Sequence, residues 1–320
     1  MSAPDFPTSA GRRLIVIATG DIALPAFRYL LAHGPCPLAL VTQPDKPVGR
    51  HQKLTPPQIK TIALAAGIPV LQPVKIADAA GELSALEPEL LVVVAYGQIL
   101  PPAVLTIASQ AIINLHASLL PRYRGAACIQ AALAAGDAMT GVTAIHVVRE
   151  LDAGDVICAR SLAIAADETG GSLHDRLAEL AVEVLAEALC QLAAGSAVRS
   201  PQDVASSSYV AKLQRADGRL DWTRPAAVLE RQIRAYDPWP GTFTSTSVDG
   251  QTQRLKIHPP TAVVEMLLDP GQIVSDHARL IVGCGQHALE IFTVQPDGSK
   301  RMSASAYLRG RKPLDFQSAE

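Results

Sequence analysis

The sequence lacks most of the features that place a chain quickly in a class. Its five cysteines are dispersed and form no Cys-x-x-Cys pair or Cys/His cluster, which argues against a disulfide framework and against a zinc site. No apolar run reaches the roughly 18 residues that a membrane span needs, and Met1–Arg13 has no continuous apolar stretch like that of a signal peptide. We therefore expect a reduced, cytoplasmic protein with no metal and no membrane partner.

Two further absences concern ligands. The Gly-x-Gly-x-x-Gly fingerprint is missing, since Thr19-Gly20-Asp21 offers a single glycine after the first apolar run, and this argues against a nicotinamide cofactor. The formal net charge is only −2, so no bulk charge indicates a nucleic-acid partner. The C-terminal third is nevertheless mildly basic, while the rest is acidic. A polyanion would therefore be attracted by local patches rather than by net charge.

What is present is apolar sequence in quantity: 48% of the residues are hydrophobic and 18% are charged, which is enough for sizeable cores. Short apolar runs alternate with helical patterns along the first two thirds of the chain. Strands are predicted at 14–17, 38–41, 90–94, 111–113 and, as a pair, within 142–164; helices are predicted at 21–33, 56–66, 101–109 and 172–194. This alternation predicts a Rossmann-like, doubly wound α/β sheet.

The composition changes to Gly, Ser, Pro and Asp between residues 195 and 208, which is typical of a linker. Short strand-like pieces separated by turns follow, and their spacing predicts a small barrel or sandwich. We therefore expect a catalytic domain at 1–194, a linker at 195–208 and a second domain at 209–320.

The segment Asn114–Gly125, Asn-Leu-His-Ala-Ser-Leu-Leu-Pro-Arg-Tyr-Arg-Gly, is the most informative one. Asn114 and His116 follow a buried strand two residues apart, so the pleat aims both side chains at the same face. Pro121 then ends any central strand. Open α/β sheets build their sites beyond the carboxyl ends of strands. A lone histidine at a strand end is more often a surface residue, and it is the combination of residues that favours a catalytic site.

This segment resembles the active-site signature of the 10-formyltetrahydrofolate-dependent formyltransferases. Ser118–Pro121 and Arg124–Ala127 match the version found in the branch that formylates initiator methionyl-tRNA. The resemblance extends from Leu14 to about Leu308, and residues 212–241 resemble the start of that branch's C-terminal, oligonucleotide-binding-like (OB-like) domain. It implies a Rossmann-like domain followed by a small OB-like β-barrel that binds tRNA.

The resemblance also implies the chemistry. Formyl transfer to an amine passes through a tetrahedral intermediate with a developing oxyanion, so the site needs hydrogen-bond donors and a proton acceptor. Asn114 and His116 would stabilise the oxyanion. Asp152, within Leu-Asp-Ala-Gly-Asp, matches the catalytic aspartate of the family and would assist proton transfer. Without the resemblance, this last motif would be taken for an ordinary turn.

Two segments resemble the family's folate pocket. Ser118, Leu119, Leu120 and Pro121 offer an apolar wall for a pterin ring, with backbone groups to bind its edge. Val94 and Tyr96 follow a predicted strand and resemble another part of this pocket, although Val-Ala-Tyr-Gly is also a common strand-to-turn junction. The co-substrate implied is 10-formyltetrahydrofolate, with no metal.

Two basic segments are candidates for tRNA contact. The loop 42–54 contains prolines and glycine that we expect to preclude regular structure, and it resembles the tRNA-contacting insertion of the family, with Arg50 at the key position. Its candidate residues are Lys46, Arg50 and Lys53. Residues 300–312 contain no acidic residue and are expected to meet phosphates through Lys300, Arg301, Arg309, Arg311 and Lys312. The alternative for either segment is a solvated surface.

Two departures from the family pattern lie near the expected pocket. Ala18–Ile22 replaces Gly-Thr-Pro-Asp-Phe, and Cys128 replaces a common proline, so the family's contacts to the methionine side chain are not carried over to these positions. One alternative function is formylation of a small amine, such as a nucleotide sugar or glycinamide ribonucleotide. Another is a catalytically silent RNA-binding protein, which would not require Asn114, His116 and Asp152. No obligate protein partner is evident.

Overall fold

The computed structural model describes residues 13–48, 52–248, 251–275, 279–309 and 315–317. The chain divides into two compact units. The first contains Met1–Cys128, Met139–Leu162 and His174–Val210, and the second contains Ile129–Ala138, Ala163–Leu173 and Ala211–Glu320. Both units draw on the first two thirds of the chain, so each unit is discontinuous in sequence.

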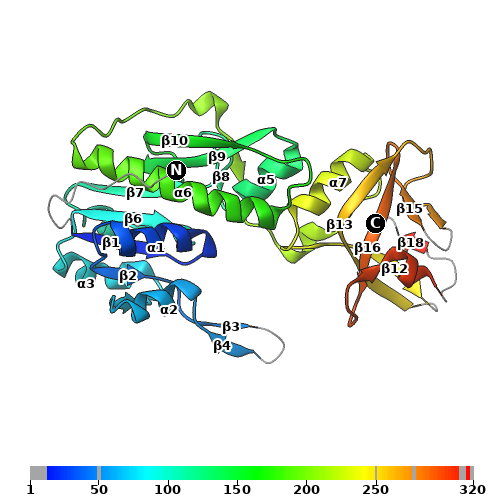
Figure 1. Ribbon diagram of the computed structural model, residues 1–320, viewed down its shortest axis with the longest axis horizontal. Coiled ribbons are helices and arrows are strands. Elements are labelled where there is room, and N and C mark those ends of the chain that lie inside the picture. Colours follow the sequence, from blue (N-terminus) through cyan, green and yellow to red (C-terminus); the bar gives the residue numbers. More distant parts are fainter. Residues whose placement is uncertain (1–12, 49–51, 249–250, 276–278, 310–314, 318–320) are drawn as a thin grey trace. The chain divides into compact units, whose positions relative to one another are not determined.

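A seven-stranded sheet forms the centre of the first unit (Figure 1), in the order β10-β9-β7-β6-β1-β2-β5. Its strands are β1 (Leu14–Ala18), β2 (Ala39–Val41), β5 (Val70–Leu71), β6 (Leu90–Val94), β7 (Ala111–His116), β9 (Met139–His146) and β10 (Val156–Ala163). The pairs from β7 to β5 are parallel, and β9 runs antiparallel to β7. The uninterrupted apolar runs of β1 and β6 are buried throughout, as a sheet covered on both faces requires.

Helices cover this sheet: α1 (Leu24–His33), α2 (Gln58–Ala65), α3 (Ala80–Ala85), α4 (Pro102–Leu105) and most of α6 (Gly170–Ala193), with 3-10 turns at Asp21–Ala23, Ile76–Ala79 and Val204–Ser206. All of α5 (Cys128–Ala135) except its first residue and the 3-10 turn Arg215–Gly218 belong to the second unit. The leucines of α6 recur at helical spacing, and Leu177, Leu185 and Leu192 are buried. This stripe is therefore core packing. No described helix is long and apolar enough to cross a membrane.

The loop 42–54 contains regular structure, so our expectation that its Pro and Gly residues preclude it is wrong. β3 (Lys46–Val48) and β4 (Lys53–Thr55) pair antiparallel in a ribbon that projects beyond the sheet (Figure 1). A proline is tolerated here because each strand of a two-stranded ribbon is an edge strand. At the base of the ribbon, Asp45 accepts hydrogen bonds from Lys60 Nζ and Gln72 Nε2, each at 2.8 Å.

The segment 195–208, expected as a linker, makes specific contacts within the first unit. Ser200 forms a β-bridge with Val156. The chain continues into β11 (Tyr209–Val210), which pairs parallel with β8 (Arg124–Gly125). This segment is therefore fixed to the end of the sheet where Asn114 and His116 lie.

An antiparallel sheet forms the second unit, in the order β14-β15-β16-β13-β12-β18, with β17 beside β16. The strands are β12 (Thr242–Val248), β13 (Gln251–Val264), β14 (Ile273–Ser275), β15 (Leu280–Gly283), β16 (Ala288–Pro296), β17 (Met302–Ser303) and β18 (Asp315–Gln317), with helices α7 (Ala226–Ala235) and α8 (Ala304–Leu308). Trp222 is fully buried in the core of this unit, and its Nε1 donates to Thr244 Oγ1 at 3.0 Å. The predicted fold class, a Rossmann-like domain followed by a small β domain, is confirmed.

Candidate active site

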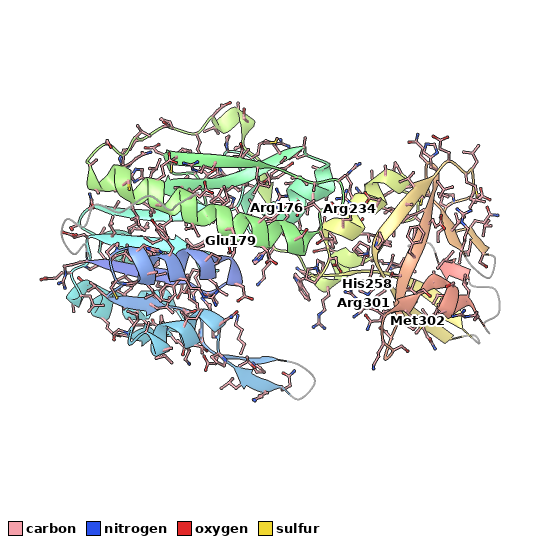
Figure 2. The ribbon with its side chains drawn as sticks, viewed as in Figure 1. Arg176, Glu179, Arg234, His258, Arg301 and Met302 are labelled. Atoms are coloured by element: carbon pink, nitrogen blue, oxygen red, sulfur yellow. The ribbon has the colours of Figure 1, made fainter. Side chains whose placement is uncertain are left out.

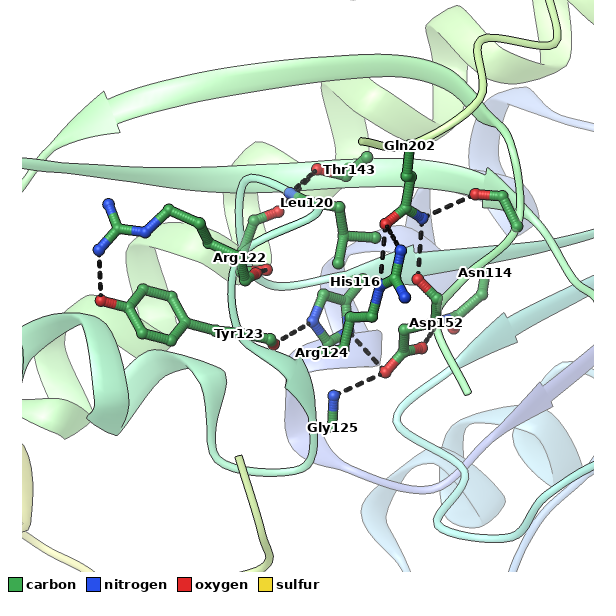
Figure 3. A network of polar contacts seen from close by, with 12 residues as sticks. Asn114, His116, Leu120, Arg122, Tyr123, Arg124, Gly125, Thr143, Asp152 and Gln202 are labelled. Carbon is green, nitrogen blue, oxygen red and sulfur yellow. Dashed lines mark hydrogen bonds and ion pairs between the residues drawn. The ribbon is translucent and has the colours of Figure 1, made fainter. Parts of the chain in front are cut away.

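Three polar side chains converge at the end of β7 (Figure 3). Asn114 Nδ2 donates to Asp152 Oδ1 at 3.2 Å, and His116 Nδ1 lies 3.6 Å from Asp152 Oδ2. The two strand residues share a face because they are two positions apart, as the sequence predicted. Asp152 reaches them from the turn between β9 and β10. The three candidate catalytic residues are thus brought together by adjacent antiparallel strands.

The turn that contains Asp152 has a strained backbone that is held in place by neighbouring groups. Asp152 has φ +51°, a left-handed conformation that aspartate adopts more readily than most residues. Its Oδ2 accepts a hydrogen bond from the backbone N–H of Gly125 at 2.9 Å. Gly125 has φ +103°, and a Cβ there would lie 2.3 Å from the carbonyl oxygen of Val210. Only glycine fits where β8 meets β11, and this close approach aims its N–H at the carboxylate.

The surroundings of His116 favour its charged form. Burial of the imidazole lowers its pKa, but the charge and hydrogen bond of Cys128, the charge of Asp152 and the Tyr123 carbonyl outweigh burial and raise the pKa of His116 to about 9. His116 Nε2 lies 2.9 Å from the Tyr123 carbonyl oxygen, which can only accept, so this nitrogen carries a proton. Cys128, a departure from the family pattern, is therefore a neighbour of the candidate catalytic histidine.

The segment Ser118–Pro121 is held by two hydrogen bonds to the side chain of Thr143 in β9. Thr143 Oγ1 donates to the Ser118 carbonyl at 2.7 Å and accepts from the Leu120 N–H at 3.2 Å. Ser118 itself is fully buried, and its hydroxyl donates to the Arg122 carbonyl at 2.7 Å. Leu119, Leu120 and Pro121 remain half-buried, which leaves part of their apolar surface accessible.

Val94 and Tyr96, the other residues expected near the folate, are both buried, Val94 at the end of β6 and Tyr96 two residues beyond it. Tyr96 is 2% exposed within a hydrophobic cluster, its phenol oxygen has no hydrogen-bond partner, and burial raises its pKa. The residues exposed at this strand end are Ala95 and Gly97, both with positive φ. Any ligand at this strand end would therefore meet the backbone of residues 95–97 more readily than the side chains of Val94 and Tyr96.

The candidate tRNA-contacting residues of the ribbon share one face. The register pairs Lys46 with Thr55 and Val48 with Lys53, so Lys46 and Lys53 project to the same side, and both are exposed. Arg50, the position that the resemblance singled out, lies outside the described residues. The ribbon thus presents two cations on one face, at diagonal positions of the register.

The basic residues near the C-terminus differ from one another. Lys300 and Arg309 are exposed. Arg301 Nη2 lies 3.3 Å from Asp237 Oδ1, and His258 Nδ1 lies 3.6 Å from the same oxygen; Figure 2 labels His258 and Arg301. A hydrogen bond from His258 and the charge of Arg301 hold the pKa of Asp237 below its usual range. Arg301 therefore has an intramolecular partner, while Arg311 and Lys312 lie outside the described residues.

The sequence did not identify Gln202 as a site residue. Its Nε2 donates to the carbonyls of Asp152 and Gly154 at 2.8 and 2.7 Å, and its Oε1 accepts from Arg124. No local pattern could have indicated this, because Gln202 lies in the segment that its composition marked as a linker. No cluster of three or more His, Cys, Asp or Glu residues that could hold a metal occurs among the described residues.

Comparisons with known proteins identify the family of the chain. Residues 33–189 match the family model described as formyl transferase, and residues 212–312 match the one described as formyl transferase, C-terminal domain. The chain is 49% identical to methionyl-tRNA formyltransferase of Akkermansia muciniphila over 94% of this chain and 98% of that one. It is 43% identical to methionyl-tRNA formyltransferase of Marinobacter nauticus over 94% and 97% of the two chains.

Solved structures share the fold at low identity. The sugar 3N-formyl transferase WlaRD matches with a TM-score of 0.64 and 14% identity, over 91% of this chain and 100% of that one. HypX from Aquifex aeolicus in complex with tetrahydrofolic acid matches with a TM-score of 0.61 and 18% identity, over 97% of this chain and 51% of that one. At this identity the likeness concerns the fold alone.

Proposed function

The chain belongs to the methionyl-tRNA formyltransferase family, and from this premise we propose that it transfers the formyl group of 10-formyltetrahydrofolate to the amino group of initiator methionyl-tRNA. The observation that carries the proposal is the convergence of Asn114, His116 and Asp152 at the end of β7. A protein that only bound RNA would need neither the buried histidine nor the carboxylate against it.

Asn114 and His116 act on the oxygen of the formyl group. An amide NH₂ carries two hydrogens, and donation of one to Asp152 leaves the second for the substrate oxygen as negative charge develops there. His116 contributes the positive charge of its imidazolium, which its raised pKa maintains at neutral pH. Both groups are fixed before the substrate arrives, so little reorganisation is needed during the reaction.

Asp152 assists with the proton. The amine must lose a proton when it forms the new C–N bond, and the Asp152 carboxylate can accept it. The tetrahydrofolate nitrogen must gain a proton as its bond to the formyl carbon breaks, and the His116 imidazolium can supply it. Asp152 accepts hydrogen bonds from Asn114 Nδ2 and from the Gly125 N–H, and its Oδ2 lies 3.6 Å from His116 Nδ1, so its two oxygens are held in fixed directions. The carboxylate thereby orients the other two members of the trio.

The two substrates would approach over surfaces already described. Leu119, Leu120 and Pro121, with the backbone of residues 95–97, offer the flat apolar surface that suits the folate, which supplies the formyl carbon when bound. Lys46 and Lys53 on the ribbon suit the phosphates of an RNA acceptor end. Lys300 and Arg309 are further exposed cations for the same backbone.

The test is formyl transfer from 10-formyltetrahydrofolate by the purified protein to three acceptors: methionine-charged initiator tRNA, charged elongator tRNA, and small amines including a nucleotide amino sugar. We expect initiator methionyl-tRNA to be preferred. Preference for a small amine would overturn the substrate assignment, and no transfer to any acceptor would overturn the activity.

A paired substitution tests the site itself. His116→Asn should lower kcat by about 10²–10⁴ while folding is retained. The matched control is His174→Asn on α6, because His174 also pairs with an aspartate, Asp175 at 3.0 Å, but away from the trio. Near-normal turnover in a folded His116→Asn variant, or an equal loss in His174→Asn, would contradict the assignment.

A further inference from the structure

We propose that Gln202 is a positioning residue for formyl transfer, which fixes the turn that carries Asp152 to the buried guanidinium of Arg124. This inference rests on the proposed function. The segment 195–208 would then contribute to the geometry of the active site and would not only connect two domains.

The contacts of Gln202 define its orientation without ambiguity (Figure 3). Arginine has only donors and carbonyl groups have only acceptors, so the Gln202 amide cannot be reversed. Its Oε1 accepts from Arg124 Nε at 3.0 Å and Nη2 at 2.7 Å. Its Nε2 donates to the carbonyls of Asp152 and Gly154. Both hydrogens and both lone pairs of the amide are therefore used, two on each side.

The turn needs such a support. A non-glycine residue in the left-handed region, as Asp152 is with φ +51°, costs on the order of 1–3 kcal/mol and persists only where its surroundings hold it. Gly154 lies in the same turn, and a Cβ there would lie 1.7 Å from the His146 carbonyl oxygen. The backbone is thus pressed against β9 on one side and held by Gln202 through two carbonyls on the other.

Arg124 is a firm anchor because it is buried. The residue is 3% exposed, and its Nη1 donates to the Tyr209 hydroxyl at 2.9 Å. A buried guanidinium requires acceptors to offset the loss of water. Gln202 Oε1 accepts two of its hydrogen bonds, so Arg124 holds the amide that in turn holds the Asp152 turn.

Two substitutions separate these contacts. Gln202→Glu keeps an acceptor for Arg124 but replaces the donor with an oxygen that faces the Asp152 and Gly154 carbonyls. Gln202→Met keeps the length of the side chain and removes both kinds of contact. We expect each variant to lower kcat about 10- to 100-fold, because a small displacement of a catalytic group is enough to lose that much. KM for both substrates should change less than threefold, since neither substrate touches Gln202.

The titration of His116 is the measurement that a merely structural role of Gln202 would leave unchanged. It can be monitored by NMR on histidine-labelled protein, and the His116 signal can be assigned by its absence in His116→Asn. In both Gln202 variants the His116 titration should move to lower pH, because Asp152 no longer lies against Nδ1, while Cys128 and the Tyr123 carbonyl stay in place. The control is Gln110→Met, where the amide donates to Leu192 at the other end of β7. It should leave both kcat and the titration unchanged.

The outcomes are distinguishable. If wild type transfers no formyl group to any acceptor, the proposed function fails. If wild type is active and folded Gln202→Glu and Gln202→Met keep its kcat and its His116 titration, the Gln202 proposal fails alone. A lower kcat in both with an unshifted His116 titration would also overturn it, because positioning of Asp152 would then not be the cause.

Discussion

Replacement of Asp152 by asparagine should separate the charge of this side chain from its shape. In the wild type the pKa of His116 is raised to about 9, and we infer that the imidazolium is the active form. The rate should therefore fall as pH rises through this pKa. Without the nearby negative charge the imidazolium is less stable, so the pKa of His116 falls. The alkaline decline of kcat/KM therefore moves to lower pH.

The size of the shift follows from the geometry. Two unit charges 3.6 Å apart attract by about 1 kcal/mol in water and about 5 kcal/mol at an effective dielectric constant of 20. The pair is largely buried, so the value lies between these limits. One pKa unit corresponds to about 1.4 kcal/mol, which predicts a decrease of about 1–3 units. The amide also has one oxygen for two donors, Asn114 Nδ2 and the Gly125 N–H, and kcat should fall by about 100-fold or more.

The assay is the initial rate of formyl transfer between pH 6 and 10, with circular dichroism to establish folding. The substrate amine must be neutral to react, and its titration affects wild type and variant alike. Asp155→Asn is the control, because Asp155 lies in the same turn and pairs only weakly with exposed Arg199 at 3.9 Å. An alkaline decline at the wild-type pH in folded Asp152→Asn, or an equal shift in Asp155→Asn, would refute the reasoning.

Three further outcomes are expected. Cys128→Ala should move the alkaline decline of kcat/KM to lower pH, since Cys128 raises the pKa of His116; an unchanged pH profile would contradict this. A Lys46→Ala/Lys53→Ala double variant should raise KM for tRNA, leave kcat nearly unchanged and reduce the slope of log KM against log salt by roughly one unit for each lost phosphate contact; parallel slopes would show that the ribbon does not meet RNA. Gly154→Ala should destabilise the fold by about 1–3 kcal/mol in urea denaturation and reduce turnover, because its Cβ would lie 1.7 Å from a carbonyl oxygen; wild-type stability and rate would contradict that crowding.

The sequence predicted the parts of the site that depend on periodicity. Asn114 and His116 share a face because a strand has a period of two, and the apolar run at 111–113 before them was predicted as a buried strand. Their meeting with Asp152 could be proposed only from the family resemblance, because the sequence does not determine which strands are neighbours. The antiparallel placement of β9 beside β7 brings the carboxylate to them.

The misses have different physical origins. The ribbon at 46–55 was overlooked because proline and glycine were taken to exclude strands, whereas an edge strand needs only half of its backbone groups paired. Gln202 was overlooked because a segment rich in Gly, Ser and Pro resembles a linker even when its backbone is fixed by β-bridges and hydrogen bonds. The assignment of Val94 and Tyr96 to the folate pocket stays a prediction from their motif, and both side chains are buried.

The 50 residues between Asp152 and Gln202 also set an order of events during translation. A ribosome that adds about 5–20 residues each second reaches Gln202 about 3–10 s after Asp152. During that interval β8 has no β11 beside it and Arg124 has no amide to accept from it. The nascent chain can assemble its parallel strands early, yet its carboxylate turn stays without this support until residues 200–210 have emerged. Catalytic competence is thus acquired late in synthesis, well after the aspartate itself.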